Sequence, residues 1–259
     1  MKKIFLSPSN QSDNTYAYGD TNEAAVCGQI AKATERALKR CGFEVKTMQW
    51  ETAQARCKES DAWGADLHVP IHSNAYNGKV TGTRLFVYKT SGEAYEAAKD
   101  IFNELAPLTP GTSENIQSYP GLIELKNPKA PSVYIEVDFH DNKEVAKWLV
   151  ENTDEIGEAI CKGICKHYER KFVEDLINVI TEGKELPAHY DTAKAGTYTV
   201  NTSNGLFFRK GPSTDSKSLD LFEAGTQVVC LGHYTGDWLY VETVDNRVGF
   251  CHSDFLTKS

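Results

Sequence analysis

The stretch that decides the fold is ADLHVPIHSNAYNGKVTGTRLFVY, residues 65–88. It holds two short apolar runs, 67–73 and 82–89, on either side of a polar segment that contains Asn and Gly. Each run has the length of a β-strand, and turn-forming residues separate the two. The stretch therefore predicts two successive strands joined by a loop.

Strands and helices alternate on both sides of this stretch. In 22–41, apolar side chains recur at helical spacing and Gly42 follows as a terminator. The further strands are predicted at 3–7, 43–48, 122–126 and 132–139, and the further helices at 51–62, 93–105 and 143–170. This alternation predicts a three-layer α/β domain over residues 1–171, with a mostly parallel or mixed sheet.

The pattern changes after residue 171. Residues 172–195 are predicted to be a linker, of which 172–185 is compatible with a short amphipathic helix. From 196 to 259 no helical period is present, and turn residues separate short strands predicted at 198–200, 206–208, 227–232, 238–243 and 247–252. This region is predicted to be a small all-β barrel.

Composition excludes several classes of protein. The 259 residues are 40% hydrophobic and 25% charged, which is typical of a globular protein and not of a disordered one. The net charge of −8 disfavours binding to the phosphate backbone of nucleic acids. No apolar run approaches the ~18 residues of a transmembrane helix. The start, MKKIFLSPSN, has too short an apolar run for a secretory signal, so synthesis in the cytoplasm without a Sec leader is expected.

The seven cysteines form no CxxC pair. Without a signal for secretion, we expect reduced and mostly buried thiols. Cys161 and Cys165 are four residues apart in a predicted helix and therefore share one face. A metal-binding pair is conceivable there, but a stripe of small packing residues is the favoured interpretation.

The C-terminal region contains an ordered series of motifs: Arg209, the Gly-Pro-Ser of 211–213, the Gly-Thr of 225–226, Trp238 and the Gly-Phe of 249–250. In this order they resemble bacterial SH3-like repeats. The resemblance implies a domain that attaches hydrolases to the bacterial cell wall. Tyr234, Trp238 and Tyr240 are candidate groove residues for peptide or glycan stems. For Trp238 and Phe250, a place in the barrel core is the favoured alternative.

Three patches of the N-terminal region carry a second resemblance. They are LSPSNQSDNTYAYGDTNEAA (6–25), the stretch 65–88 quoted above, and APSVYIEVDFHDN (130–142). Together, over about residues 3–170, they resemble the zinc-dependent N-acetylmuramoyl-L-alanine amidases of the type-3 amidase family. The resemblance implies a Zn²⁺ cofactor, peptidoglycan as the partner, and hydrolysis of the amide between N-acetylmuramic acid and L-alanine.

A hydrolytic zinc site needs three protein ligands and an open position. His72 and Glu23 match the family's downstream histidine and its glutamate ligand. The alternative for Glu23 is a capping box with Asp20 as the helix cap. The family's other histidine is missing from the loop 7–11, SPSNQ. We predict Gln11 as the third ligand and Asn10 as the fallback; the alternative is that both only stabilise a turn.

Glu136 lies within the otherwise apolar strand VYIEVDF. A carboxylate there is costly unless it is paired or kept for chemistry. It matches the family's catalytic glutamate, and burial would raise its pKa to suit a general base that later acts as an acid. The alternative is an ion pair with Arg84 or Lys126, and Asp138 is the reserve candidate for the base.

Other polar residues receive lesser roles. His68 would lie roughly 13 Å from His72 along one strand face, too far to share an ion, so it is predicted to be a core residue or a partner of the site. Asn74 and His140 are predicted to contact the substrate, although His140 is equally placed to cap the turn at 141–142.

Two other functions remain open at this point. One is a catalytically inactive wall-binding protein on an amidase scaffold, favoured only by the missing histidine. The other is cleavage of a different amide, such as a peptide. In the favoured case the protein acts at the bacterial cell wall after endolysin-like release or export by another route. The sequence gives no oligomeric state.

Overall fold

The computed structural model describes residues 1–173, 187–244 and 247–259. The chain divides into two compact units, Met1–Val173 and Glu174–Ser259. Among the described residues, no helix is both long and apolar enough to cross a membrane.

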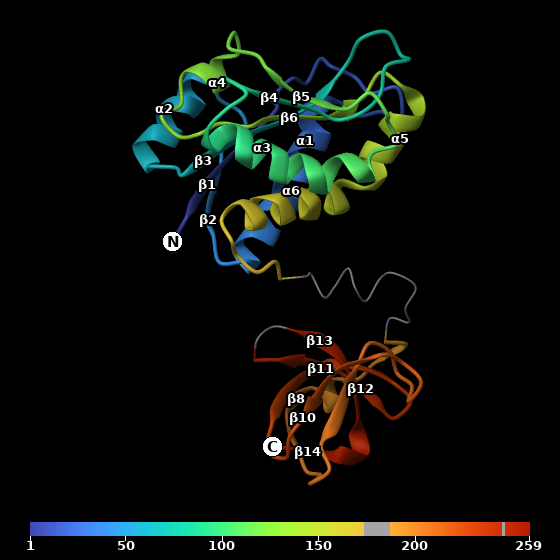
Figure 1. Cartoon of the computed structure of the whole chain (residues 1–259). Helices are drawn as coiled ribbons and strands as arrows, with labels where there is room; N and C mark the ends of the chain where they lie inside the picture. Colours follow the sequence, from blue (N-terminus) through green and yellow to red (C-terminus); the bar gives the residue numbers. More distant parts are fainter. Residues whose placement is uncertain (174–186, 245–246) are drawn as a thin grey trace. The chain divides into compact units, whose positions relative to one another are not determined.

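The first unit is built on a mixed six-stranded sheet (Figure 1). Its strands are β1 (Lys3–Pro8), β2 (Glu44–Thr47), β3 (Leu67–Asn74), β4 (Arg84–Val87), β5 (Asn115–Ser118) and β6 (Tyr134–Phe139). Their spatial order is β2-β1-β3-β6-β4-β5, and every pair is parallel except β4–β6. The mixed sheet between helices is the α/β fold that the sequence predicts.

Helices cover both faces of this sheet. They are α1 (Glu23–Arg40), α2 (Ala53–Trp63), α3 (Glu93–Leu105), α4 (Ile123–Lys126), α5 (Lys143–Glu151) and α6 (Thr153–His167), with a 3₁₀ turn at Ala106–Leu108. Helix α6 packs against α1 and α3 on one face, and α2 packs against α4 on the other (Figure 1). The approach of α6 to α3 needs Gly163, because a Cβ there would lie 2.3 Å from the Ile101 Cα.

Apolar and polar side chains alternate along the central strands, so one face of the sheet is apolar and the other is polar. Leu6, Val69, Ile71 and Ile135 belong to the main core cluster with residues of α1, α3 and α6. Side chains at intervening positions share the opposite face because strand neighbours alternate. That face carries the pair His72 and Glu136, which lie opposite one another in register on β3 and β6. The polar residues of the family resemblance therefore gather on one side of the sheet.

Three elements of this unit differ from the prediction. Residues 123–126, predicted as a strand, form α4, because the run LIEL is too short for periodicity to distinguish the two. The predicted helix 143–170 breaks at Asn152, whose side-chain amide donates to the Trp148 carbonyl at 2.7 Å. The edge strand β5 was not predicted, since its sequence NIQS is mostly polar.

The second unit is an antiparallel all-β structure. Its strands are β7 (His189–Tyr190), β8 (Gly196–Val200), β9 (Leu206–Arg209), β10 (Ser218–Phe222), β11 (Gln227–Thr235), β12 (Trp238–Thr243), β13 (Val248–His252) and β14 (Leu256–Lys258), with 3₁₀ turns at Thr192–Lys194 and Ser253–Phe255. The order is β10-β9-β13-β12-β11-β8-β14, and β7 pairs with β11. Residues 189–190, within the predicted linker, are thus part of this sheet. Most of the helix suggested at 172–185 lies outside the described residues.

Candidate active site

Three predicted ligand residues meet where β1 and β3 end. His72 is near the end of β3, Glu23 is the first residue of α1, and Gln11 lies in the loop after β1. The His72 Nδ1 atom is 2.8 Å from Glu23 Oε1 and 3.4 Å from Gln11 Nε2. The carboxyl ends of neighbouring parallel strands are the edge where α/β proteins place their ligand sites.

Glu23 is directed to this site and does not cap the helix. Asn22, not Asp20, is the N-cap of α1, and its side chain accepts from the Ala25 N–H at 3.0 Å. Glu23 is 1% exposed, and its second carboxylate oxygen accepts from Asn14 Nδ2 at 2.7 Å. The capping-box alternative is therefore wrong. Burial raises the pKa of Glu23, but hydrogen bonding and charge from His72, with Asn14 and Ser9, outweigh it and leave that pKa below its usual value.

Gln11 is close to the other two but presents its amide nitrogen to His72. Its Oε1 accepts from Asn14 Nδ2 at 3.0 Å, which fixes this orientation. Rotating the Gln11 amide by 180° would direct its Oε1 at His72 and would bring its nitrogen against the side-chain amide of Asn14. Asn10 faces away, since its Nδ2 donates to the Glu51 carbonyl at 3.2 Å. Of the two amides, only Gln11 therefore lies beside His72.

Glu136 lies beside His72 on the neighbouring strand. Its Oε2 is buried and has no hydrogen-bond partner in the described part of the chain. Within the same residues, no ion pair joins it to Arg84 or Lys126; the Arg84 guanidinium donates to the Thr83 carbonyl and lies over the Phe139 ring. Burial, reinforced by the negative charge of Glu23, raises the pKa of Glu136 well above its usual value.

These side chains fit a metal ion. In a tetrahedral site with ligands at 2.0–2.2 Å, the ligand atoms are about 3.3–3.6 Å apart. The 2.8 Å distance from His72 Nδ1 to Glu23 Oε1 is slightly shorter than this spacing, and Gln11, whose amide nitrogen lies 3.4 Å from His72 Nδ1, reaches it with its oxygen after the 180° rotation described above. The unpaired oxygen of Glu136 nearby is the kind of group that such a site retains for proton transfer.

The reserve base and one predicted substrate contact are held by other partners. Asp138 is fully buried, and its Oδ1 accepts from the Gly82 and Phe139 N–H groups at 2.6 and 2.7 Å. His140 is 3% exposed; its Nδ1 lies 2.9 Å from Ser73 Oγ, and its ring stacks on Tyr16 at 4.8 Å. Both stabilise the loops around the site in these positions.

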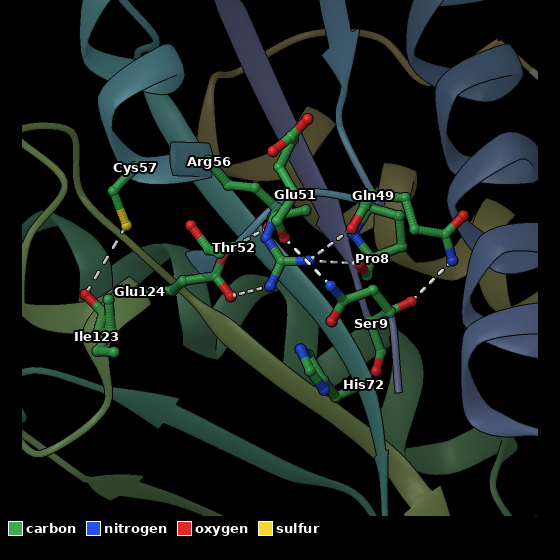
Figure 2. A network of polar contacts seen from close by, with 12 residues as sticks. Pro8, Ser9, Gln49, Glu51, Thr52, Arg56, Cys57, His72, Ile123 and Glu124 are labelled. Atoms are coloured by element: carbon green, nitrogen blue, oxygen red, sulfur yellow. Dashed lines mark hydrogen bonds and ion pairs between the residues drawn. The ribbon is translucent and has the colours of Figure 1, made fainter. Parts of the chain in front are cut away.

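A buried polar network that the sequence analysis did not identify supports the site (Figure 2). Glu124 of α4 accepts from Arg56 Nη2 at 2.7 Å, and its other oxygen pairs with Ser7 Oγ and lies 3.2 Å from His68 Nε2. Arg56 also donates to the Pro8 carbonyl at 3.1 Å. Two helices on the polar face thus fix the end of β1, from which the Gln11 loop starts. Helix α2 buries Arg56 together with Cys57 and Ser60, and this set of residues forms no apolar stripe from which Arg56 could have been identified in the sequence.

A pocket of about 360 Å³ extends from His72 along this network. Gln11, Arg56 and Tyr134 are among its lining residues, together with Asn10, Thr52, Ala53, Gly121, Leu122, Ile123 and Glu124. The Tyr134 ring stacks against His72 with centroids 4.5 Å apart. The pocket gives a substrate a place next to the candidate ligands.

The aromatic candidates of the second unit are all partly exposed. Trp238 packs edge-on against His252 at 5.0 Å, and Tyr240 lies 5.1 Å from the Phe250 ring. Tyr234 packs beside His189, with the Lys194 ammonium 4.6 Å from its ring centroid. Phe250 is fully buried, as the core alternative expects, whereas Trp238 keeps part of its surface exposed.

Comparison with known families identifies a family for each of the two regions. The family model for N-acetylmuramoyl-L-alanine amidase matches residues 4–166. The chain belongs to this amidase family. Met1–Val173 is hereafter the amidase unit. Residues 204–257 match the bacterial SH3 domain, and the part of the chain from 187 onward is hereafter the SH3-like unit.

Individual relatives are more distant. An uncharacterized 38.4 kDa protein of Clostridium perfringens is 29% identical over 128 residues, which are 48% of this chain and 37% of that protein. The chain therefore matches little more than a third of that curated relative. The catalytic domain of the amidase CwlV from Bacillus (Paenibacillus) polymyxa var. colistinus superposes with a TM-score of 0.60 at 19% identity, over 66% of this chain and 100% of that one. The catalytic domain of the CD27L endolysin, which targets Clostridia difficile, gives 0.56 at 23%, over 64% and 98%. These structures share the fold of the amidase unit.

Proposed function

We propose that the chain is a peptidoglycan hydrolase that cleaves the amide bond between N-acetylmuramic acid and the L-alanine of the stem peptide. The observation that carries this proposal is the meeting of Glu23, His72 and Glu136 at one edge of an amidase-family sheet. Residues that are 49 and 64 positions from His72 share this edge, and they are the types that metal-assisted amide hydrolysis requires.

In this proposal Glu23, His72 and Gln11 hold a Zn²⁺ ion. Zn²⁺ held by these residues would supply Lewis acidity, which would lower the pKa of a water molecule and polarise the scissile carbonyl. Glu136 takes a proton from the attacking water through its unpaired Oε2 and then gives it to the nitrogen of the departing L-alanine. Its raised pKa matches both tasks, because a carboxyl that titrates closer to neutrality accepts and returns a proton readily.

The chain's own residues also orient the substrate. The pocket beside His72 offers the Tyr134 ring as an apolar wall and polar groups from the Gln11 loop. Because Gln11 is neutral, as histidine is, the formal charge of the site is unchanged, but an amide donates less strongly than an imidazole. We therefore expect zinc to be held more weakly than in a site with two histidines.

The SH3-like unit is proposed to retain the enzyme on the cell wall. Its partly exposed Trp238 and Tyr240 alternate with buried Leu239 and Val241 along β12, so they share the outer face of that strand. A chain with net charge −8 is repelled at long range by anionic wall polymers, so capture would rest on such short-range contacts. The Trp238→Ala variant should sediment less with purified cell walls than the Val244→Ala variant, a change at an exposed apolar residue.

The decisive experiment for the activity is digestion of purified peptidoglycan, followed by identification of the amine released. The proposal expects new L-alanine N-termini from the wild-type chain and none from Glu136→Gln. If both fail to release amines while still binding walls, the inactive wall-binding protein is the correct interpretation. If other N-termini appear, a different amide is the substrate.

A further inference from the structure

Three cysteine sulfurs meet in the amidase unit away from the candidate active site. Cys41 follows α1 as its C-cap, and Cys161 and Cys165 lie on the inner side of α6. The Cys161 Sγ atom is 3.8 Å from that of Cys41 and 3.9 Å from that of Cys165. All three residues are buried, with exposed fractions of 7% or less. Helical spacing in the sequence brings together only Cys161 and Cys165. Cys41 is 120 positions from Cys161 in the sequence, and only the fold brings it to the other two.

The spacing of the sulfurs matches a shared metal ion. Thiolates at 2.3 Å from a tetrahedral zinc ion are about 3.8 Å apart. Across the described residues, this trio is the sole set of three or more His, Cys, Asp or Glu side chains with all ligand atoms within 4.8 Å of one another. The remaining four cysteines, Cys27, Cys57, Cys230 and Cys251, are buried but belong to no such set.

The surroundings suit thiolates bound to a cation. The Val173 N–H donates to Cys41 Sγ at 3.3 Å, a contact that stabilises negative charge on sulfur. Two guanidinium groups lie close by: Arg40 donates to the Val173 carbonyl at 2.7 Å, and Arg170 donates to the Gly42 carbonyl at 3.0 Å. Three thiolates with one divalent cation leave one negative charge; the Arg170 guanidinium can offset it, whereas Arg40 is already paired with Glu158, whose carboxylate lies 2.6 Å from Arg40 Nη2.

We propose that Cys41, Cys161 and Cys165 form a second metal site, a structural three-thiolate site for a thiophilic d¹⁰ cation such as Zn²⁺. It goes beyond the proposed hydrolysis and does not depend on it, because none of its residues belongs to the active site. Binding would tie the end of α1 to α6 and to Val173, the last residue of the amidase unit. The chain would then hold two zinc ions, only one of them catalytic.

Cobalt(II) distinguishes the two sites, because a thiolate ligand gives Co²⁺ an intense sulfur-to-metal charge-transfer band that carboxylate, amide and imidazole ligands do not. The probe is Co²⁺ added to the reduced full-length His72→Ala chain, which lacks a ligand of the candidate active site. The proposal expects one equivalent of cobalt with this band and its loss when Zn²⁺ is added. The band should also be lost in a His72→Ala, Cys161→Ser double variant and kept with Cys57→Ser, a buried cysteine of α2.

A second readout needs no cysteine substitution and so guards against a variant that fails to fold. Alkylation of the reduced His72→Ala chain, mapped by mass spectrometry, should slow at residues 41, 161 and 165 when Zn²⁺ is present and remain unchanged at residue 57. If no charge-transfer band forms and zinc protects none of the three thiols, they only fill the core and the proposal is overturned. A band that persists in a folded Cys161→Ser double variant overturns it equally.

Discussion

Replacing Glu136 by Gln should abolish hydrolysis and at the same time stabilise the metal-free amidase unit at neutral pH. Burial and the charge of Glu23 raise the pKa of Glu136, so the folded chain holds this proton more tightly than the unfolded chain. The stability that protonated Glu136 contributes is fully present below the pKa of about 4.3 that this carboxyl has in the unfolded chain. It is lost as pH rises towards the higher pKa that Glu136 has in the folded chain. An amide has no charge to bury and escapes this loss.

The size of the effect follows from the surroundings of one oxygen. Among the described residues, Glu136 Oε2 is buried without a partner, and a buried charged group left unsatisfied costs about 1–3 kcal/mol or more. We therefore expect Glu136→Gln to raise the free energy of unfolding by about 2 kcal/mol at pH 7. For a unit of this size that is a rise in Tm of about 4–8 °C.

The assay is urea unfolding followed by circular dichroism at the helix signal, with a chelator present, at pH 4 and pH 7. The described α-helices all lie in the amidase unit, so this signal reports its unfolding. The matched control is Glu51→Gln, which removes a carboxylate from an exposed residue. The increase in the free energy of unfolding that Glu136→Gln gives over wild type should be near zero at pH 4 and should appear by pH 7. Equal stability of Glu136→Gln and wild type at pH 7 would show that burying this carboxylate costs no stability. The pKa of Glu136 would then not be raised in the folded chain.

Three further predictions concern the supports of the site and fold. Gln11→Ala should weaken zinc binding by at least about tenfold in a chelator competition, because its amide is the group beside His72, whereas Asn10→Ala should change it little. Glu124→Gln leaves Arg56 in a 4% exposed site without its charge partner and should lower the free energy of unfolding by about 3 kcal/mol; a loss below about 1 kcal/mol would mean that solvent reaches this pair. Gly163→Ala should lower Tm despite alanine's better helix propensity, since its Cβ would clash with α3; an unchanged Tm would mean that the two helices can separate at little cost.

The sequence predicts which residues gather at the candidate site better than it predicts the residues that support them. His72, Glu23 and Glu136 could be identified because each lies in a stretch that resembles one family, and the structure brings them to one strand edge. The orientation of Gln11 could not be predicted, since it depends on Asn14, a loop residue with no pattern of its own. The ion pair of Arg56 and Glu124 could not be predicted either, because the sequence places residue 124 in a strand and not in a helix that faces α2.

Boundaries depended on contacts that sequence cannot show. The end of α5 at Glu151 is set by the side chain of Asn152, and the cap of α1 is Asn22 although Asp20 is an equally good capping type. In the SH3-like unit, the two-residue strand β7 is recognisable only through its pairing with β11. Tyr190 of β7 pairs with His233 of β11, which is 43 residues further along the chain. Periodicity predicts which segments form elements, whereas tertiary contacts decide where each one ends.

The most direct test of the account is an anomalous difference map, recorded at the zinc absorption edge from a crystal of the full chain grown with zinc. The account predicts a peak within coordination distance of Glu23, His72 and Gln11, with the Glu136 carboxylate beside it. A chain whose Glu23 and His72 remain hydrogen-bonded to each other with no peak between them, at zinc concentrations that support hydrolysis, would contradict it.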